Sequence, residues 1–84
     1  MGIFYFRCRS VTYAQRAVKT LERSGISCSV VKLPQHLSED GCGYGIRING
    51  RWLNQALGVL HDAGFEIRNI YTQNKNGEFK EVTM

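Results

Sequence analysis

The pair Cys42-Gly43 is the part of the chain whose residue types point most directly to chemistry. It follows a polar segment that begins at Pro34 and precedes an apolar run, so the thiol is expected where a loop joins a strand. Gly41 and Gly43 flank the cysteine and let the backbone approach the sulfur closely. An accessible thiol at such a junction is a candidate nucleophile, provided that its surroundings favour the thiolate.

The other two cysteines are weaker candidates for a reactive thiol. Cys8 is a candidate resolving thiol for Cys42, but it alternates with Phe4 and Phe6 and also fits a position in the core. Cys28 lies in phase with neighbouring apolar residues, and we interpret it as a packing residue.

His36 lies in the polar segment before Cys42 and could exchange a proton with the thiol, or it could be a surface residue. No third residue that would orient such a pair is evident, so the pattern does not favour a Cys/His hydrolase. The cysteine spacings of 20 and 14 residues contain no Cys-x-x-Cys motif, and the two histidines are far apart. We therefore expect no metal site and no cofactor.

The composition is that of one small globular domain, with 84 residues of which 43% are hydrophobic and 21% charged. No apolar run approaches the roughly 20 residues that span a bilayer, and the first residues do not resemble a signal peptide. A cytoplasmic protein with reduced thiols is expected. The net charge is +4, but the 11 basic residues are scattered, which favours a solvated surface over a nucleic-acid site.

Two apolar stripes at helical spacing predict two helices, and a shift of 39 positions places one stripe on the other. The stripes consist of Ala14, Ala17, Val18 and Leu21, and of Leu53, Ala56, Leu57 and Leu60. Ser10 or Thr12 is expected to cap the first helix and Asn49 the second. Gly25 and Gly64 are expected to end them in the left-handed conformation.

Four strands are expected, over residues 3–9, 27–33, 43–49 and 66–73. The order βαββαβ predicts an α+β fold, the ferredoxin-like split βαβ sandwich, with a four-stranded antiparallel sheet and both helices on one face. Right-handed crossovers place the first and third strands at the centre. Residues 1–73 are expected to form this single domain, and residues 74–84 a polar, loosely held C-terminal tail.

This topology gathers the candidate site at one edge of the sheet. The first strand ends there, the first helix begins there, and the segment that carries Cys42 leads into the third strand there. Ser10 and Thr12 would then lie close to the thiol. The positive end of the helix, together with Arg7 and Arg9, would favour a thiolate, and amides of the glycine-rich turn could donate hydrogen bonds to it.

With these features the chain resembles the selenium/sulfur carrier protein-like family. The resemblance extends over residues 4–71 and rests on Ser10-x-Thr12-x-Ala14, on Gly25-Ile26, on Leu33-Pro34 and above all on Cys42-Gly43. The family often has a basic residue after the proline, where Gln35 stands in this chain. The resemblance implies a carrier or accessory protein, rather than a stand-alone enzyme. Cys42 would hold a persulfide or perselenide that passes from a donor protein to an acceptor protein.

A different class of function stays open, in which Cys42-Gly43 is a structural turn and the protein is a binding or regulatory module. Ferredoxin-like sheets can present aromatic side chains to single-stranded RNA, and residues 4–6 place three of them on a central strand. The aromatic-rich RNA-binding consensus is absent, however. Outward-facing Tyr5, Tyr44 and Tyr71 would instead favour a protein partner or a homodimer.

Overall fold

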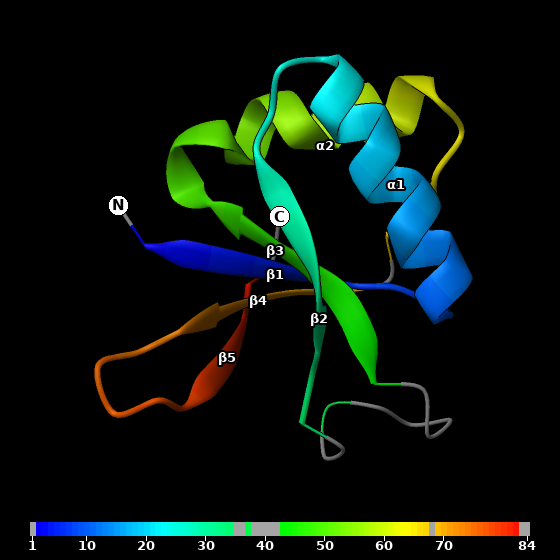
Figure 1. Cartoon of the computed structure of the whole chain (residues 1–84). Coiled ribbons are helices and arrows are strands. Elements are labelled where there is room, and N and C mark those ends of the chain that lie inside the picture. The colour runs from blue at the N-terminus through cyan, green and yellow to red at the C-terminus, as the bar shows by residue number, and fades with distance from the viewer. Residues whose placement is uncertain (1, 35–36, 38–42, 68, 83–84) are drawn as a thin grey trace.

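The computed structural model describes residues 2–34, 37, 43–67 and 69–82. In these residues two helices cover one face of a five-stranded antiparallel sheet with strand order β2-β3-β1-β4-β5 (Figure 1). The strands are β1 (Ile3–Arg7), β2 (Cys28–Lys32), β3 (Tyr44–Asn49), β4 (Asn69–Gln73) and β5 (Phe79–Val82). The helices are α1 (Val11–Arg23) and α2 (Leu53–Asp62), and a short 3-10 turn, η2 (Gly50–Trp52), leads into α2.

The α+β class, the two helices on one face and the central position of β1 and β3 agree with the prediction, but the number of strands does not. Within the segment 74–84, expected to be a loosely held tail, residues Phe79–Val82 pair with β4 as a fifth strand. Asn74 organises the connecting turn, because its side-chain oxygen accepts hydrogen bonds from the amides of Asn76 and Glu78, both at 2.9 Å. A four-residue strand in a polar segment carries little hydrophobic pattern, so it is not recognisable from the sequence.

The helices begin and end largely where the sequence predicts. Ser10 caps α1, because its hydroxyl accepts a hydrogen bond from the amide of Tyr13 at 3.0 Å. Gly25 and Gly64, each with φ of 83°, follow the two helices. Asn49 differs from the expectation, because its side chain accepts from Arg51 and so caps η2 rather than α2 itself.

The main core lies between the helices and the sheet. It contains the largest fully buried side chains, which come from every layer of the fold: Phe6, Leu21, Ile26, Ile46, Ile48, Leu60 and Cys8. The four residues of the first predicted stripe are all buried in it. Burial of this apolar surface is the principal force that holds the helices on the sheet.

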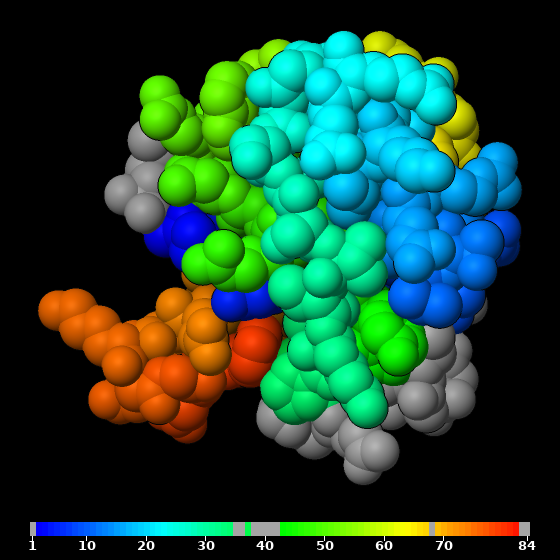
Figure 2. All heavy atoms as spheres, viewed as in Figure 1, coloured from blue at the N-terminus to red at the C-terminus, as the bar shows by residue number. Residues whose placement is uncertain are grey.

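A second, smaller cluster lies on the other face of the sheet, away from the helices. Tyr5, Leu33 and Tyr71 are buried in it. Phe79 of β5 packs edge-on against Tyr5, with ring centroids 5.0 Å apart, although β4 separates their strands. The sheet is therefore curled, so that the β4–β5 hairpin lies on the face away from the helices and projects from the body of the molecule (Figures 1 and 2).

This second cluster corrects the expectation of an outward aromatic patch. Tyr5 and Tyr71 are only 8% and 7% exposed, and Tyr44 is half-buried. Phe6, the aromatic residue next to Tyr5, points into the main core. The sheet consequently presents no row of free aromatic rings on β1 on which RNA bases could stack.

No helix among the described residues is both long enough and apolar enough to cross a bilayer.

Candidate functional site

The described part of the predicted site lies where β1 ends and β3 begins. The amide of Cys8 donates to the carbonyl of Tyr44 at 3.0 Å, which joins the two strand ends. Ser10 follows two residues later and starts α1, so Cys8, Ser10 and Gly43 reach the same edge of the sheet. Cys42, Gly41 and His36 lie outside the described residues, and their roles remain predictions.

Two glycines allow close packing at this edge. The carbonyl of Gly43 accepts a hydrogen bond from the amide of Leu33, and a Cβ on Gly43 would lie 2.8 Å from the carbonyl oxygen of Leu33. A Cβ on Gly45 would lie 2.5 Å from the carbonyl oxygen of Phe6. Both contacts are too short for a real side chain, so glycine is required here for the strands to meet. Gly43 therefore has a packing role, whatever its amide binds.

Among the described residues Arg7 is the charged residue that is buried, and it lies on β1 directly before Cys8. It is only 6% exposed and pairs in register with Gly45 on β3 and with Asn69 on β4. Its guanidinium donates to the side-chain oxygen of Asn69 at 3.0 Å, and Asn69 donates in turn to the carboxylate of Glu81 at 3.0 Å. A buried cation is tolerated only with such hydrogen bonds, so this network fixes a positive charge under the edge of the sheet.

Arg7 and Arg9 were both predicted to favour the thiolate, but the structure separates them. Arg9 is exposed, and its guanidinium lies over the ring of Tyr13 at 4.5 Å from the centroid. Asn69 and Glu81 were not identified from sequence. Only the register of β1, β4 and β5 brings them to Arg7, and β5 carries no clear signal in the sequence.

The two described thiols are both placed for packing. Cys8 is 1% exposed in the main core, and its sulfur lies 3.7 Å from the carbonyl oxygen of Phe6. Cys28 is half-buried, and burial together with the nearby carboxylate of Glu22 raises its pKa from the ordinary value of 9.0 to about 11. At neutral pH Cys28 is therefore a protonated, weakly nucleophilic thiol.

The amino end of α1 supplies partial positive charge at the same edge. Ser10 uses its hydroxyl to accept the Tyr13 amide, so this side chain serves the helix. Thr12 is exposed in the first turn, where helical geometry leaves the amides of Val11 and Thr12 without an acceptor inside the helix. An anion at this edge would gain from those amides and from the helix dipole.

In the part of the chain that the structure describes, no three His, Cys, Asp or Glu side chains are grouped to hold a metal ion.

A family model described as "Putative Se/S carrier protein-like" matches residues 4–72, a range that includes Cys42-Gly43. No curated protein and no solved structure was found to match the chain.

Proposed function

Because the chain belongs to the Se/S carrier protein-like family, we propose that it carries sulfur or selenium on Cys42, as a persulfide or a perselenide. The family match carries this proposal, because it spans most of the chain and includes the Cys-Gly pair. A donor protein would load Cys42, and an acceptor protein would receive the atom.

Loading and delivery on a thiol need no external oxidant or reductant. The Cys42 thiolate would attack the outer sulfur of a donor persulfide, and the donor's own sulfur would leave as a thiolate while one S–S bond replaces another. In delivery, a nucleophile of the acceptor would attack the outer atom, and the Cys42 thiolate would leave. Selenium would follow the same two steps through a sulfur–selenium bond.

Both steps need Cys42 as an anion, and the described surroundings support this requirement. Arg7 holds a buried positive charge on β1 opposite Gly45, which is three residues from Cys42 along the chain. A neighbouring cation favours a thiolate over a thiol, and the hydrogen bond from Arg7 to Asn69 keeps the cation in place.

The remaining predicted site residues are assigned smaller roles in this proposal. Thr12 and the first-turn amides of α1 would donate hydrogen bonds to the anionic outer atom, with Ser10 holding that turn in shape. Gly41 and Gly43 would add backbone donors. His36 would exchange protons with the bound sulfur, and Cys8 would act, if at all, only after opening of the core that encloses it.

Intact-protein mass spectrometry tests the proposal directly. The protein is incubated with a low-molecular-weight persulfide, such as glutathione persulfide, and desalted under non-reducing conditions. We expect a mass increase of one sulfur atom that dithiothreitol removes. The increase should be retained in Cys8→Ala and Cys28→Ala and lost in Cys42→Ala. An adduct that survives in Cys42→Ala, or none in the wild-type protein, would contradict the assignment of Cys42.

A further inference from the structure

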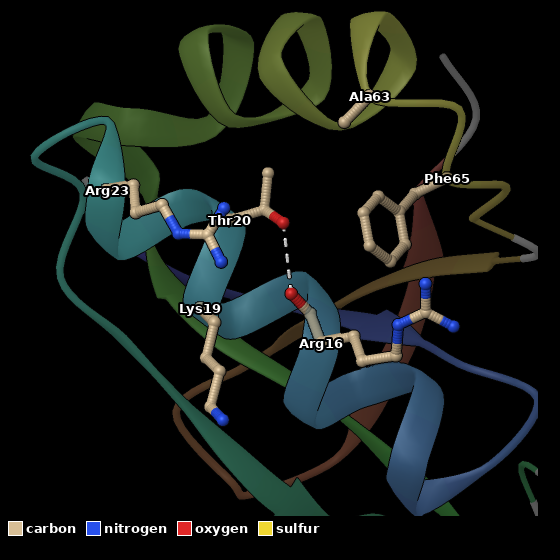
Figure 3. A pocket seen from close by; sticks show the side chains of 6 residues that line it. All are labelled: Arg16, Lys19, Thr20, Arg23, Ala63 and Phe65. Atoms are coloured by element: carbon tan, nitrogen blue, oxygen red, sulfur yellow. Dashed lines mark hydrogen bonds between the residues drawn. The ribbon is translucent and has the colours of Figure 1, made fainter.

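A basic pocket lies apart from the sheet edge where Cys8 and Gly43 lie, between the C-terminal half of α1 and the turn that follows α2 (Figure 3). Its volume is about 370 Å³. The lining residues are Arg16, Lys19, Thr20, Arg23, Ala63 and Phe65. Three of these six residues are cations and none carries a carboxylate, which makes the pocket a candidate site for an anionic group.

Among the described residues, no carboxylate forms an ion pair with the three cations. Arg16, Lys19 and Arg23 are all exposed. The carboxylate of α1, Glu22, lines an adjoining hollow with Val30 of β2, and Lys19 borders both this hollow and the pocket. The positive charge of the pocket is therefore available to a ligand.

The helix arranges the cations in a row. Arg16, Lys19 and Arg23 are spaced i, i+3 and i+7, so they follow one face of α1 over roughly 10 Å. Arg16 reaches toward Phe65 and Arg23 toward Thr20, whereas Lys19 extends outward (Figure 3). Carboxylates on a helix or a strand of another protein can match such a row of charges.

The apolar wall of the pocket is fixed in place. The ring of Phe65 packs edge-on against Tyr13 of α1, with centroids 5.2 Å apart. The hydroxyl of Tyr13 accepts a hydrogen bond from the amide of Glu66 and so ties the segment after α2 to α1. Because this ring is already held in place, it loses little side-chain freedom when a partner binds.

We propose that this basic pocket docks an acidic surface of the protein that exchanges sulfur or selenium with Cys42. The identity of the partner rests on the proposed function, whereas binding of an acidic protein surface does not. The position fits this role, because α1 begins at the edge where Cys8 and Gly43 lie and ends at the pocket. A partner that lies along α1 would thus reach the edge where Gly43, the residue after Cys42, lies.

The surroundings favour a protein over a nucleic acid. Asp62 and Glu66 are exposed next to Ala63 and Phe65, and Glu22 lines the adjoining hollow that Lys19 also borders. An extended phosphate backbone would run past the three cations and meet these carboxylates. A protein surface can place carboxylates at the centre and other groups at the rim. Phe65 is also packed against Tyr13 and is only half-exposed, which leaves little area for base stacking.

Titration by two-dimensional NMR at low salt tests this proposal. The probe is a helical 15-residue peptide with glutamates at positions spaced i, i+3 and i+7. We expect the shifted amides to cluster on residues 16–23 and 63–66. A variant carrying Arg16→Gln, Lys19→Gln and Arg23→Gln should weaken binding by about tenfold or more. Glutamine is a good helix former at these exposed positions, and circular dichroism would check that α1 is retained.

A second triple variant serves as the matched control. Arg51→Gln, Lys75→Gln and Lys80→Gln remove the same charge from exposed positions elsewhere, and we expect less than about a threefold loss. Equal losses in the two triple variants would overturn the proposal in favour of non-specific attraction. Tighter binding of 15-nucleotide polyuridine than of the peptide at the same residues would overturn it in favour of RNA.

The two proposals fail separately. Cys42→Ser should bind the peptide as the wild type does, and the variant with the three glutamines on α1 should still accept sulfur from glutathione persulfide. A persulfide adduct on Cys42 without specific peptide binding would contradict the docking proposal and leave the carrier proposal standing. Specific peptide binding without an adduct would remove the carrier role of Cys42 and leave an acid-binding pocket.

Discussion

The two faces of the sheet differ in what they bury. The helix-side face packs large apolar side chains, among them Phe6, Ile46 and Leu60, against α1 and α2. The opposite face buries Tyr5 and Tyr71 beside hydrogen-bonded polar groups and is closed in part by the β4–β5 hairpin. The difference indicates that the helix side supplies most of the stability, whereas the other side also holds a hydrogen-bonded polar network.

Two neighbouring residues of β1 separate these contributions most clearly, because they point to opposite faces. Phe6→Ala leaves a cavity in the main core and should lower the free energy of unfolding by about 3–5 kcal/mol. Tyr5→Phe removes only the hydroxyl that donates to Gln73 at 3.2 Å, and should cost about 1 kcal/mol. Urea denaturation measures both losses in the free energy of unfolding. If Phe6→Ala costs no more than Tyr5→Phe, the helix-side face does not supply most of the stability.

The polar network under the site predicts the next largest effect. Arg7→Met removes the hydrogen bond to Asn69 and leaves the half-buried side-chain oxygen of Asn69 without this donor, so we expect a loss of about 1–3 kcal/mol in the free energy of unfolding. The variant should also slow alkylation of Cys42 at neutral pH by about three- to tenfold, because it removes the cation that favours the thiolate. Iodoacetamide labelling followed by peptide mass spectrometry measures this rate.

Arg47→Met is the matched control for this effect. Arg47 pairs with Tyr5 on the same face but is exposed, so its loss should change stability and Cys42 labelling little. If Arg7→Met loses stability but labels at the wild-type rate, the network stabilises the fold without acting on the thiol. We expect iodoacetamide to label Cys42 faster in Arg47→Met than in Arg7→Met.

The aromatic contact that closes the second face should have an intermediate effect. Phe79→Ala removes the edge-on contact with Tyr5 and should cost about 1–1.5 kcal/mol. Hydrogen exchange should quicken in β5 first and leave β1 and β3 protected, because β5 lies at the edge of the sheet. If β5 exchanges at the same rate in the wild type and in Phe79→Ala, the contact with Tyr5 does not stabilise β5.

Residue patterns predicted the helix-side face better than the other face for a physical reason. The stripe Ala14, Ala17, Val18 and Leu21 repeats at the helical period and is buried as expected, because local periodicity reports which side of a helix faces the core. The strand order follows from the element order and the handedness of crossovers. These features depend on near neighbours in the chain or on general rules of connection.

The polar face could not be predicted in the same way. The hydrogen bonds from Arg7 to Asn69 and from Asn69 to Glu81 link β1 to the β4–β5 hairpin, Arg7 and Asn69 are 62 residues apart in the sequence, and β5 was missed. The close approach of Gly45 to Phe6 also depends on the register between strands rather than on any local pattern. The cysteine at the centre of the hypothesis was found only because its residue type and flanking glycines mark it in the sequence.

The smallest expected effect lies at the margin of the helix-side face, where Cys28 packs against the core but is partly open to water. Its pKa is raised to about 11 in the folded protein from an ordinary value of 9.0, so the folded state holds this proton more tightly than the unfolded state does. The resulting stabilisation is complete below about pH 9 and is lost as the pH rises toward 11. Partial exposure screens the effect, so we expect a difference of less than about 1 kcal/mol. Comparing the urea midpoints of the wild type and Cys28→Val at pH 8 and pH 10.5 separates the effect of Cys28 from that of other groups that lose a proton in this range. The wild type should lose slightly more stability than the variant between pH 8 and pH 10.5. An equal loss would mean that folding does not raise the pKa of Cys28.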